Sequence, residues 1–416
     1  MTNFVFIFIF SGISLTALTG NPVDQQLISH IKVEAGNYDR YQTPVSLTLD
    51  SLTGIDASLL KLYEVRGNER VYVPVQFSYD GKRYMHWQLQ SKVDAGTILN
   101  YELVKGVQSP TGPGLQINYE EGTYTFFKGS LPVLQYNAAT VYPPAGANES
   151  FKRSGFIHPL YAPDGTILTQ IQPADHMHHY GIWNPWTRTT FRDEVVDFWN
   201  LRKEQGTVRH AGVVSRIEGP VFAALEVMHE HIAWPESTRQ TRAMNERNIT
   251  KLYNHSENIF LLEFEFHLTP DENIVLEEYR YGGFVFRGTA DWNNETSDFI
   301  TSEGLDRDHA DGQRAYWCLI DGKTNSGNSG ILFMGSPDNY NHPEPLRVWP
   351  SDANQGKGDV FINFSPTRNT SWNLQAHDTY VLKYRMLVFS GKMEPNMAEK
   401  IWNDYANPPR ITWEIK

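Results

Sequence analysis

The segment Asp175-His-Met-His-His-Tyr180 is the densest group of side chains that could do chemistry in this sequence. On a β-strand, His176, His178 and Tyr180 would share one face, because side chains alternate along a strand. Asp175 and His179 would then point to the opposite face. Glycine and proline residues on both sides favour a strand or an extended loop. A helical turn would instead place Asp175 against His179, one turn later.

Three interpretations of this segment stay open. His176 and His178 have a spacing that suits a divalent metal ion, with Asp175 as a third ligand or as an orienting group. An imidazole is also suited to general acid or base catalysis, since its pKa lies near neutrality and a carboxylate can fix its tautomer. In the third interpretation, the histidines form a buried polar network that joins strands. The catalytic candidates are therefore His176, His178, His179 and Asp175, and the reaction stays open.

Further polar residues lie among aromatic ones. Glu303, which precedes a glycine, is a candidate acid, base or metal ligand, or else a solvated turn residue. Asp197 is another candidate carboxylate. The residues that could bind a substrate are His158, Tyr180, Trp183, Arg280, Arg287, Arg347 and Trp349. The three arginines could hold the carboxylate of an acidic sugar through paired hydrogen bonds, or pair with structural carboxylates.

These candidates predict one site. We expect His176 and His178 to project together into the main cleft of the C-terminal part of the chain. Glu303 and at least one of Arg280 and Arg287 should lie beside them.

The elements that must position these residues are almost all strands. Alternating, β-branched and aromatic runs predict strands at 28–33, 71–77, 123–127, 221–232, 259–268, 330–333 and 380–389. Helical periodicity is found at about 396–406 and ends before Pro408. Because residues 142–148 have the composition of a linker, we expect two domains. A small β-sandwich over 21–145 would precede a large β-supersandwich over 150–416, in an all-β fold.

Composition excludes several functional classes. The 416 residues include 36 Lys and Arg against 48 Asp and Glu, a formal net charge of −12. Such a chain lacks the positive charge that nucleic-acid binding needs, so we expect no nucleic-acid partner. The 13% of aromatic residues suits large sheets or a cleft that stacks on sugars. The sequence contains no Gly-x-Gly-x-x-Gly, P-loop or Gly-x-Ser-x-Gly motif, which argues against nucleotide cofactors and serine-hydrolase chemistry.

The N-terminal residues predict export. An apolar run over 4–18, followed by small residues, predicts a signal peptide over 1–20 and a periplasmic or extracellular protein. Later stretches are too short to span a bilayer, so we expect no stable membrane insertion after cleavage. Cys318 is the single cysteine, which excludes an intramolecular disulfide, and its apolar neighbours predict burial.

The same blocks carry a family resemblance. The chain resembles a bacterial exported family labelled methane oxygenase PmoA-like in its segments 154–165, 175–183, 197–199, 278–280, 301–304 and 333–339. Within these segments, the positions that match the family pattern include His158, Asp175, His176, His178 and His179. The resemblance implies a galactose-mutarotase-like β-sandwich and a role in carbohydrate use. It does not imply a methane oxygenase in the literal sense, because that is a multi-span membrane subunit and this chain has one apolar segment.

Together these observations predict an exported carbohydrate-active enzyme. Hydrolysis of a plant or algal polysaccharide fragment is the first expectation, ahead of elimination or epimerisation, through a cleft of His, Glu and Arg. Hydrolysis needs two carboxyl groups at a defined separation. The alternative is a noncatalytic glycan-binding protein with an aromatic platform. A concave pocket in which the histidines meet an arginine and Glu303 favours the enzyme.

Overall fold

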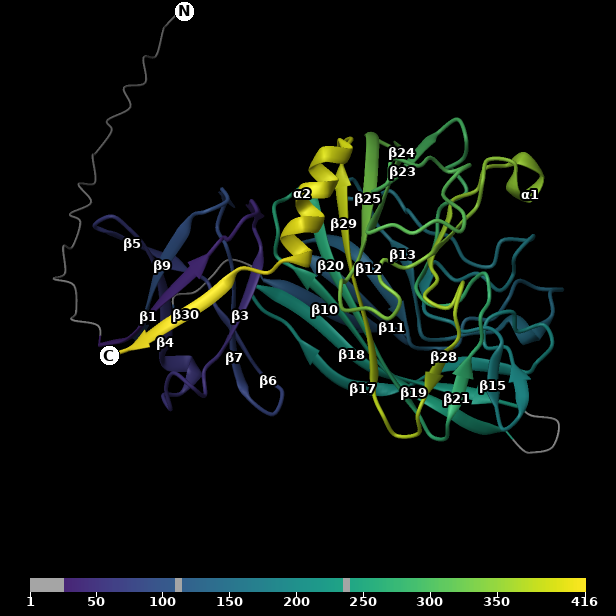
Figure 1. Cartoon of the computed structure of the whole chain (residues 1–416), viewed down its shortest axis with the longest axis horizontal. Coiled ribbons are helices and arrows are strands. Elements are labelled where there is room, and N and C mark those ends of the chain that lie inside the picture. The colour runs from purple at the N-terminus through teal and green to yellow at the C-terminus, as the bar shows by residue number, and fades with distance from the viewer. Residues whose placement is uncertain (1–25, 109–113, 235–239) are drawn as a thin grey trace, which may run out of the picture.

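The computed structural model describes residues 26–108, 114–234 and 240–416, and Figure 1 shows their arrangement. The predicted signal peptide over 1–20 lies outside the described residues, so export stays a prediction. The all-β prediction is confirmed, because strands dominate and helices are few and short. Neither α1 (Ala353–Gly356) nor α2 (Pro395–Ala406) has the length or apolarity that crossing a bilayer requires, and the described ranges contain no other α-helix.

The large part of the molecule is a sandwich of two sheets, each with eight strands among the described residues. One sheet has the order β17 (Gly206–Ile217), β18 (Phe222–Ala233), β19 (Thr241–Tyr253), β20 (Ile259–Pro270), β29 (Tyr380–Ser390), β25 (Gly327–Gly335), β24 (Trp317–Thr324) and β23 (Ser297–Thr301). The other has the order β10 (Leu115–Glu120), β11 (Thr123–Lys128), β12 (Leu131–Asn137), β13 (Phe156–Leu160), β14 (Ile182–Trp183), β22 (Val285–Arg287), β27 (Phe361–Phe364) and β26 (Leu346–Val348). A smaller sheet adds β16 (Glu194–Val196), β15 (Thr189–Phe191), β21 (Ile274–Leu276) and β28 (Trp372–Leu374).

Strand alternation explains how the sandwich closes. Along β20, Phe260, Leu262 and Phe264 point into the core between the two large sheets. Leu261, one position out of phase, belongs to a second cluster on the outer face, where it is packed with residues of α2 such as Ala398. The predicted helix at 396–406 is therefore confirmed, and it covers one sheet on the side away from the main core.

The N-terminal part is a second, smaller sandwich. Its larger sheet has the order β30 (Arg410–Ile415), β1 (Leu27–Glu34), β9 (Ile98–Lys105), β4 (Leu60–Arg66) and β5 (Glu69–Val73). The facing sheet contains β3 (Pro44–Thr48), β7 (Arg83–Gln88) and β6 (Gln76–Tyr79), and β2 (Arg40–Tyr41) pairs with β8 (Lys92–Val93). The strand predicted over 71–77 is divided into β5 and β6, since Pro74 lacks the N–H that a continuous ladder needs.

Sheet pairing differs from the predicted boundary between 145 and 150. Strands β10, β11 and β12 belong to a sheet of the large sandwich, because β12 pairs with β13 in an antiparallel ladder. The last strand, β30, crosses back and pairs with β1 in the N-terminal sheet, as Figure 1 shows in yellow against purple. The linker-like residues 142–148 therefore form a loop inside the large sandwich rather than a domain boundary.

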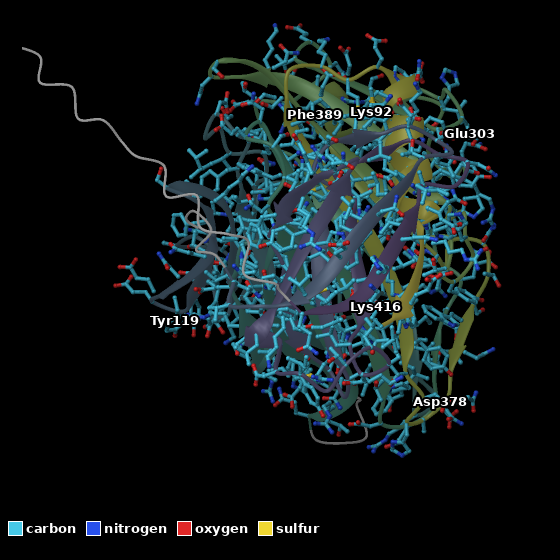
Figure 2. The ribbon with its side chains drawn as sticks, turned by 90° about the vertical axis from the view of Figure 1, so that its left-hand side faces the viewer. Lys92, Tyr119, Glu303, Asp378, Phe389 and Lys416 are labelled. Carbon is cyan, nitrogen blue, oxygen red and sulfur yellow. The ribbon has the colours of Figure 1, made fainter. Side chains whose placement is uncertain are left out.

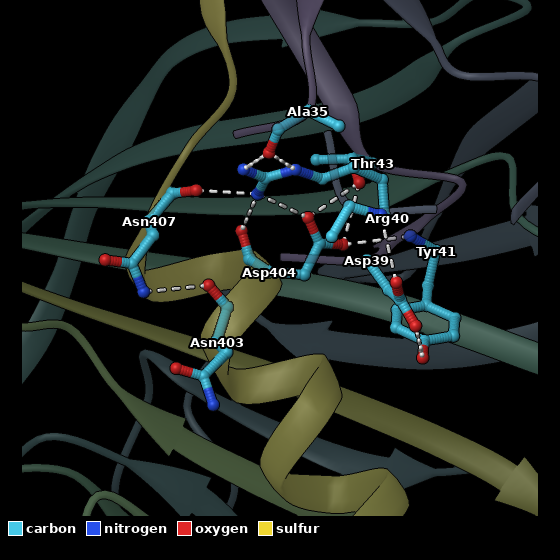
Figure 3. A network of polar contacts seen from close by, with 9 residues as sticks. Ala35, Asp39, Arg40, Tyr41, Thr43, Asn403, Asp404 and Asn407 are labelled. Atoms are coloured by element: carbon cyan, nitrogen blue, oxygen red, sulfur yellow. Dashed lines mark hydrogen bonds and ion pairs between the residues drawn. The ribbon is translucent and has the colours of Figure 1, made fainter. Parts of the chain in front are cut away.

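A buried ion pair joins the two sandwiches at the start of this crossing (Figure 3). Arg40 Nη1 lies 3.0 Å from Asp404 Oδ1 of α2, and both side chains are almost completely buried. The Asp404 carboxylate also accepts from the Thr43 hydroxyl at 2.7 Å and from the Tyr41 N–H at 3.1 Å. Breaking a buried ion pair leaves an unpaired charge away from water, which costs free energy. The pair therefore holds α2 against the N-terminal part.

Candidate functional site

The histidine segment is a loop built from consecutive turns. An isolated bridge between Ile171 and Tyr180 closes the loop, and the Gln172 N–H donates to the His179 carbonyl at 2.8 Å. Inside it, the His176 N–H donates to the Pro173 carbonyl at 2.9 Å and the His179 N–H donates to the His176 carbonyl at 3.0 Å. The prediction that alternate side chains share a strand face is therefore wrong for this segment.

The turns bring the three imidazoles together. The ring centroids of His176 and His178 lie 5.6 Å apart, those of His176 and His179 4.9 Å, and those of His178 and His179 4.7 Å. Strand alternation would have separated His179 from the other two. Because a turn reverses the chain direction within a few residues, neighbours in sequence can face one volume.

These rings line a cavity of about 230 Å³, which we call the histidine cavity. Its lining residues are His176, His178, His179, Trp199, Asn200, Arg280, Tyr281, Arg347, Trp349 and Phe361. Six of these ten were candidates from the sequence, namely His176, His178, His179, Arg280, Arg347 and Trp349. The structure thus collects residues from separate segments of the chain in one concave site.

Aromatic rings form much of the wall. The Trp349 ring centroid lies 4.6 Å from that of His176 and 5.0 Å from that of Phe361. His179 is stacked on Phe361 at 5.1 Å and is almost completely buried. Tyr281 adds a hydroxyl that interacts with Asn200 at 3.3 Å. The rings of this wall pack mainly against one another, which fixes its shape.

Burial sets the protonation of the histidines. It lowers the pKa of His178 to about 4, and the nearby His176 imidazole adds to the effect. Complete burial lowers the pKa of His179 well below its ordinary value. Both imidazoles are therefore neutral at pH 7 and each has a nitrogen that can accept a proton or a hydrogen bond. The Nδ1 atom of His179 is buried and has no hydrogen-bond partner among the described residues.

The charged groups of the lining are cationic. The exposed Arg280 has no carboxylate within ion-pair distance in the part of the chain that the structure describes, and its guanidinium lies over the Tyr281 ring. Arg347 Nη1 lies 2.8 Å from Asp311 Oδ2, and Asp311 is shared with Arg368, also at 2.8 Å. Among the described residues, no Asp or Glu lines the histidine cavity. One carboxylate thus serves two arginines, and Arg280 is the cation of the lining without such a partner among the described residues.

Two candidates lie on the other side of the cavity wall. Asp175 and Arg287 line an adjoining cavity and not the histidine cavity. The Arg287 guanidinium lies over the Trp349 ring at 4.7 Å and 3.0 Å from Asp359 Oδ2. Asp175 Oδ2 lies 3.3 Å from His176 Nδ1, consistent with an orienting carboxylate. The prediction that at least one of Arg280 and Arg287 lies beside the histidines holds for Arg280. Arg287, also a candidate for binding substrate, does not line the histidine cavity, because its side chain pairs with Asp359 and packs on Trp349.

Three other candidates lie outside the histidine cavity. Tyr180 is fully buried and its hydroxyl donates to the Phe151 carbonyl, so it does not extend the face of His176 and His178. Trp183 is buried, with its ring 5.5 Å from His179. His158 Nδ1 lies 2.9 Å from the Thr169 hydroxyl, outside the histidine cavity. Tyr180 and Trp183 belong to the buried aromatic cluster behind the wall, and none of the three residues lines the cavity.

The nominated carboxylates do not line the cavity. Glu303 is exposed on a turn after β23 and accepts from the Ser302 hydroxyl at 3.3 Å; Figure 2 shows it at the periphery of the molecule. Asp197 caps the turn that follows it, accepting from the Trp199 N–H at 2.8 Å and the Asn200 N–H at 3.0 Å. The prediction for Glu303 is wrong, because a turn glycine indicates chain reversal as readily as a site.

A metal site finds no support in this geometry. Within residues 26–108, 114–234 and 240–416, no group of three or more His, Cys, Asp or Glu side chains is arranged to hold a metal ion. His176 and His178 lack the third protein ligand that a zinc site requires. Cys318 is buried as predicted, in β24.

Sequence reasoning missed four lining residues and one buried network. Trp199, Asn200 and Tyr281 lie in polar and aromatic segments around Asp197 and Arg280 that the sequence singled out, but they were not nominated as site residues. Phe361 carried no such signal. The network centres on Glu246 of β19, whose carboxylate interacts with His229 Nδ1 and His231 Nε2, each at 3.1 Å. The pattern His229-Glu-His231 within a predicted strand was its available signal, since alternation places both histidines on one face.

Comparison with known proteins identifies the family. The family described as "Family of unknown function (DUF6807)" matches residues 125–403, and the chain belongs to it. The matched range contains the histidine cavity and most of the large sandwich. Curated proteins gave no match.

Several solved structures of carbohydrate-active enzymes are similar to the chain at low identity. A protein in the Glycosyl Hydrolase Family 38 from Enterococcus faecalis is 10% identical, with 94% of this chain and 47% of that chain covered and a TM-score of 0.42. A galactose mutarotase related enzyme from Lactobacillus acidophilus is 10% identical, with 67% and 99% covered and a TM-score of 0.34. Heparan sulfate lyase HepC from Pedobacter heparinus is 10% identical, with 70% and 38% covered and a TM-score of 0.30. The chain spans about half the length of the first, and similarity at this level assigns no activity.

Proposed function

We propose that this protein is a carbohydrate-active enzyme that binds one acidic sugar unit in the histidine cavity and moves a proton on it. The observation that carries the proposal is the composition of the lining. Two arginines, three clustered histidines and a set of aromatic rings meet there without a carboxylate among the described residues. Membership of the PmoA-like family and export stay predictions that agree with such a role.

The positive lining selects the ligand. Arg280 and Arg347 present guanidinium groups to the cavity; Arg347 is paired with Asp311, whereas Arg280 has no carboxylate within ion-pair distance among the described residues. A planar guanidinium holds a carboxylate through two parallel hydrogen bonds, which makes a sugar acid a better ligand than a neutral sugar. A protein with a formal net charge of −12 would repel anions elsewhere on its surface, so this positive site is also where an anion would be drawn.

The size of the cavity limits the ligand. At about 230 Å³ it is smaller than the ~300–1,000 Å³ typical of pockets for drug-sized molecules. One sugar ring is the unit that we infer for it. The polymer from which that ring comes would have to extend beyond the cavity.

The histidines suit proton abstraction more than hydrolysis. Hydrolysis by the common route needs two carboxyl groups beside the scissile bond, and the described lining has none. In the reaction that we propose, the His178 imidazole takes the proton from the carbon next to the sugar carboxylate. The electron pair of the broken C–H bond moves onto the carboxylate, where the arginines stabilise the added charge.

Two outcomes complete the reaction. Return of a proton from water to the opposite face of that carbon gives epimerisation. Expulsion of the oxygen substituent on the next carbon, which leaves with the proton that His178 has taken up, gives elimination. A bound carboxylate also raises the pKa of nearby imidazoles, which makes His178 a stronger base in the complex than in the free protein.

The experiment combines binding with proton exchange. We would measure calorimetric affinity for glucuronic and galacturonic acids against glucose and galactose, and follow deuterium uptake from D₂O into the sugar by NMR. We expect the acids to bind at least tenfold more tightly than the neutral sugars and to exchange the proton next to the carboxylate. His178→Ala should bind and lose exchange, whereas Arg280→Ala should lose affinity.

The matched control is His309→Ala, an exposed histidine outside the cavity that is paired with Asp306. It should leave both measurements unchanged. Tight binding without exchange in the wild type would instead assign a noncatalytic glycan-binding protein. Equal affinity for acidic and neutral sugars would overturn the proposal.

A further inference from the structure

A second cavity adjoins the histidine cavity. It has a volume of about 600 Å³ and is lined by Gln170, Pro173, Ala174, Asp175, Arg287, Ala290, Asn293, Lys357 and Asp359. We call it the amide cavity, after Gln170 and Asn293. Its lining shares no residue with that of the histidine cavity in the described part of the chain, so the two are separate volumes.

The wall between the two cavities is thin. Asp175 lines one cavity and His176, the next residue, lines the other. On the opposite side of the wall, the Arg287 guanidinium of the amide cavity lies 4.7 Å from the centroid of the Trp349 ring, which lines the histidine cavity. This wall therefore consists of one turn of the loop that contains His176 and of the stacked side chains of Arg287 and Trp349. A chain molecule that enters the histidine cavity would reach the amide cavity by passing over this wall.

The chemistry of the amide cavity differs from that of its neighbour. Its two cations, Arg287 and Lys357, are balanced by the carboxylates of Asp175 and Asp359. The Asn354 amide fixes these carboxylates by donating to Asp359 Oδ2 at 2.6 Å and also to Asp175 Oδ2. The result is a formally neutral lining that offers donors and acceptors side by side.

Balanced donors and acceptors suit hydroxyl groups. A sugar hydroxyl donates one hydrogen bond and accepts two, so it matches amides and charged pairs that present both functions. Arg287 is 1% exposed, and its Nη1 atom has no hydrogen-bond partner among the described residues, which leaves a buried donor unsatisfied beside this cavity. This atom has almost no accessible surface, so a ligand acceptor would satisfy it only after the Arg287 side chain shifts toward the cavity.

We propose that the amide cavity is a subsite for a neutral sugar unit linked to the acidic unit in the histidine cavity. The substrate class is then an oligosaccharide in which an acidic residue adjoins a neutral one. This inference rests on the proposed function, because the acidic unit is the one assigned to the histidine cavity. It goes beyond that function by assigning a second site and by stating that the acidic sugar unit is linked to a neutral one.

The experiment compares one sugar unit with two. Calorimetry would measure the affinity of glucuronic and galacturonic acids and of disaccharides in which each is linked to neutral xylose or rhamnose. We expect at least one disaccharide to bind tenfold or more tightly than its acidic half. Lys357→Ala and Gln170→Ala should each reduce that gain by threefold or more while leaving the affinity for the acidic monosaccharide unchanged.

The matched control is Lys400→Ala, which removes an exposed lysine of α2 far from both cavities in the sequence. It should preserve the gain, and thermal melting would verify that each variant is folded. If the acids bind and no disaccharide binds more tightly, the subsite is overturned while the proposed function stands. If neither the acids nor the disaccharides bind, both proposals fall. A gain that survives Lys357→Ala and Gln170→Ala would place the second sugar elsewhere and also overturn the subsite.

Discussion

At the scale of single residues, burial decides what each titratable group of the site can do. His178 has a pKa of about 4 because its surroundings exclude water, so its imidazole is an acceptor at neutral pH. Arg280 is exposed, and its guanidinium remains available for an anion. Asp175, 3.3 Å from His176 Nδ1, is the carboxylate that could orient an imidazole at the cavity. The three side chains differ in exposure. His178 can therefore act as a base, Arg280 as a cation and Asp175 as an orienting carboxylate.

Glu303 gives a direct test of these assignments. We expect Glu303→Ala to leave both sugar-acid affinity and deuterium exchange within twofold of the wild type, because its exposed side chain has only Ser302 as a hydrogen-bond partner among the described residues. Its effect on the free energy of unfolding should be within about 0.5 kcal/mol, as for exposed positions in general. Calorimetry, NMR exchange and urea unfolding measure the three quantities. A tenfold loss of exchange would restore Glu303 to the site.

The sequence predicted which titratable and charged residues form the site better than it predicted the aromatic residues that they contact. His176, His178, His179, Arg347 and Trp349 were recognisable, because titratable groups among aromatic residues are uncommon outside functional sites. Trp199 and Phe361 were missed, since an aromatic residue in a strand-rich chain is equally expected in the core. Trp199 and Phe361 reach the cavity because the fold brings together segments that are far apart in the chain. Sequence periodicity does not reveal such contacts.

At the scale of elements, the histidine loop depends on the residue that ends it. Gly181 follows the bridge between Ile171 and Tyr180 and has a φ of +59°, a conformation that side chains other than glycine rarely adopt. A Cβ atom at this position would lie 2.4 Å from the Ile157 carbonyl oxygen of β13. The loop is therefore seated against β13 by a contact that only glycine permits.

Gly181→Ala should consequently disturb the site and the fold together. We expect it to lower the free energy of unfolding by about 3 kcal/mol or more, from the left-handed backbone and the steric overlap combined. Gly165→Ala is the matched control, because Gly165 has a φ of +84° but open space where a Cβ atom would lie. That variant should lose only about 1–2 kcal/mol. Urea unfolding compares them, and equal losses would contradict the role of the Ile157 contact.

The strand prediction failed in the histidine segment for a physical reason. Alternation is informative only where a ladder holds the chain extended, and residues 173–179 hydrogen-bond within the loop. Long strands such as β18, β20 and β29 were predicted well, because their apolar periodicity extends over many residues. The return of β30 to the N-terminal sheet could not be predicted, since pairing across the whole chain leaves no local pattern.

At the scale of the whole molecule, partly buried histidines are distributed through both sandwiches. Burial lowers the pKa to about 4 for five of them, namely His86, His158, His178, His210 and His255. The Glu246 network lies between the two large sheets, where Tyr136 of β12 meets His229 of β18 at 2.7 Å. Burial opposes ionisation of Glu246, yet its hydrogen bonds to His229 and His231 hold its pKa at about 2.

All of these pKa shifts lower the free energy of unfolding as the pH falls. A histidine with a folded pKa of about 4 stays neutral below pH 6.5, whereas the same residue in the unfolded chain takes up a proton. The unfolded state therefore binds more protons between pH 6.5 and 4, and the free energy of unfolding falls as the pH falls. Glu246 continues the trend below pH 4.5, because protonation in the unfolded chain precedes protonation in the folded one.

We therefore expect the free energy of unfolding to fall throughout the range from pH 6.5 to 4, by up to ~1.4 kcal/mol per pH unit for each of these histidines. Urea unfolding at half-unit steps of pH would measure the slope. His255→Asn should reduce the slope by up to ~1.4 kcal/mol per pH unit, since it removes one proton of difference between the two states. His309→Asn is the control: this exposed imidazole has its pKa raised by Asp306, so its removal should not reduce the slope. Stability that stays constant or rises on acidification to pH 4 would show that the buried histidines are protonated in the folded protein.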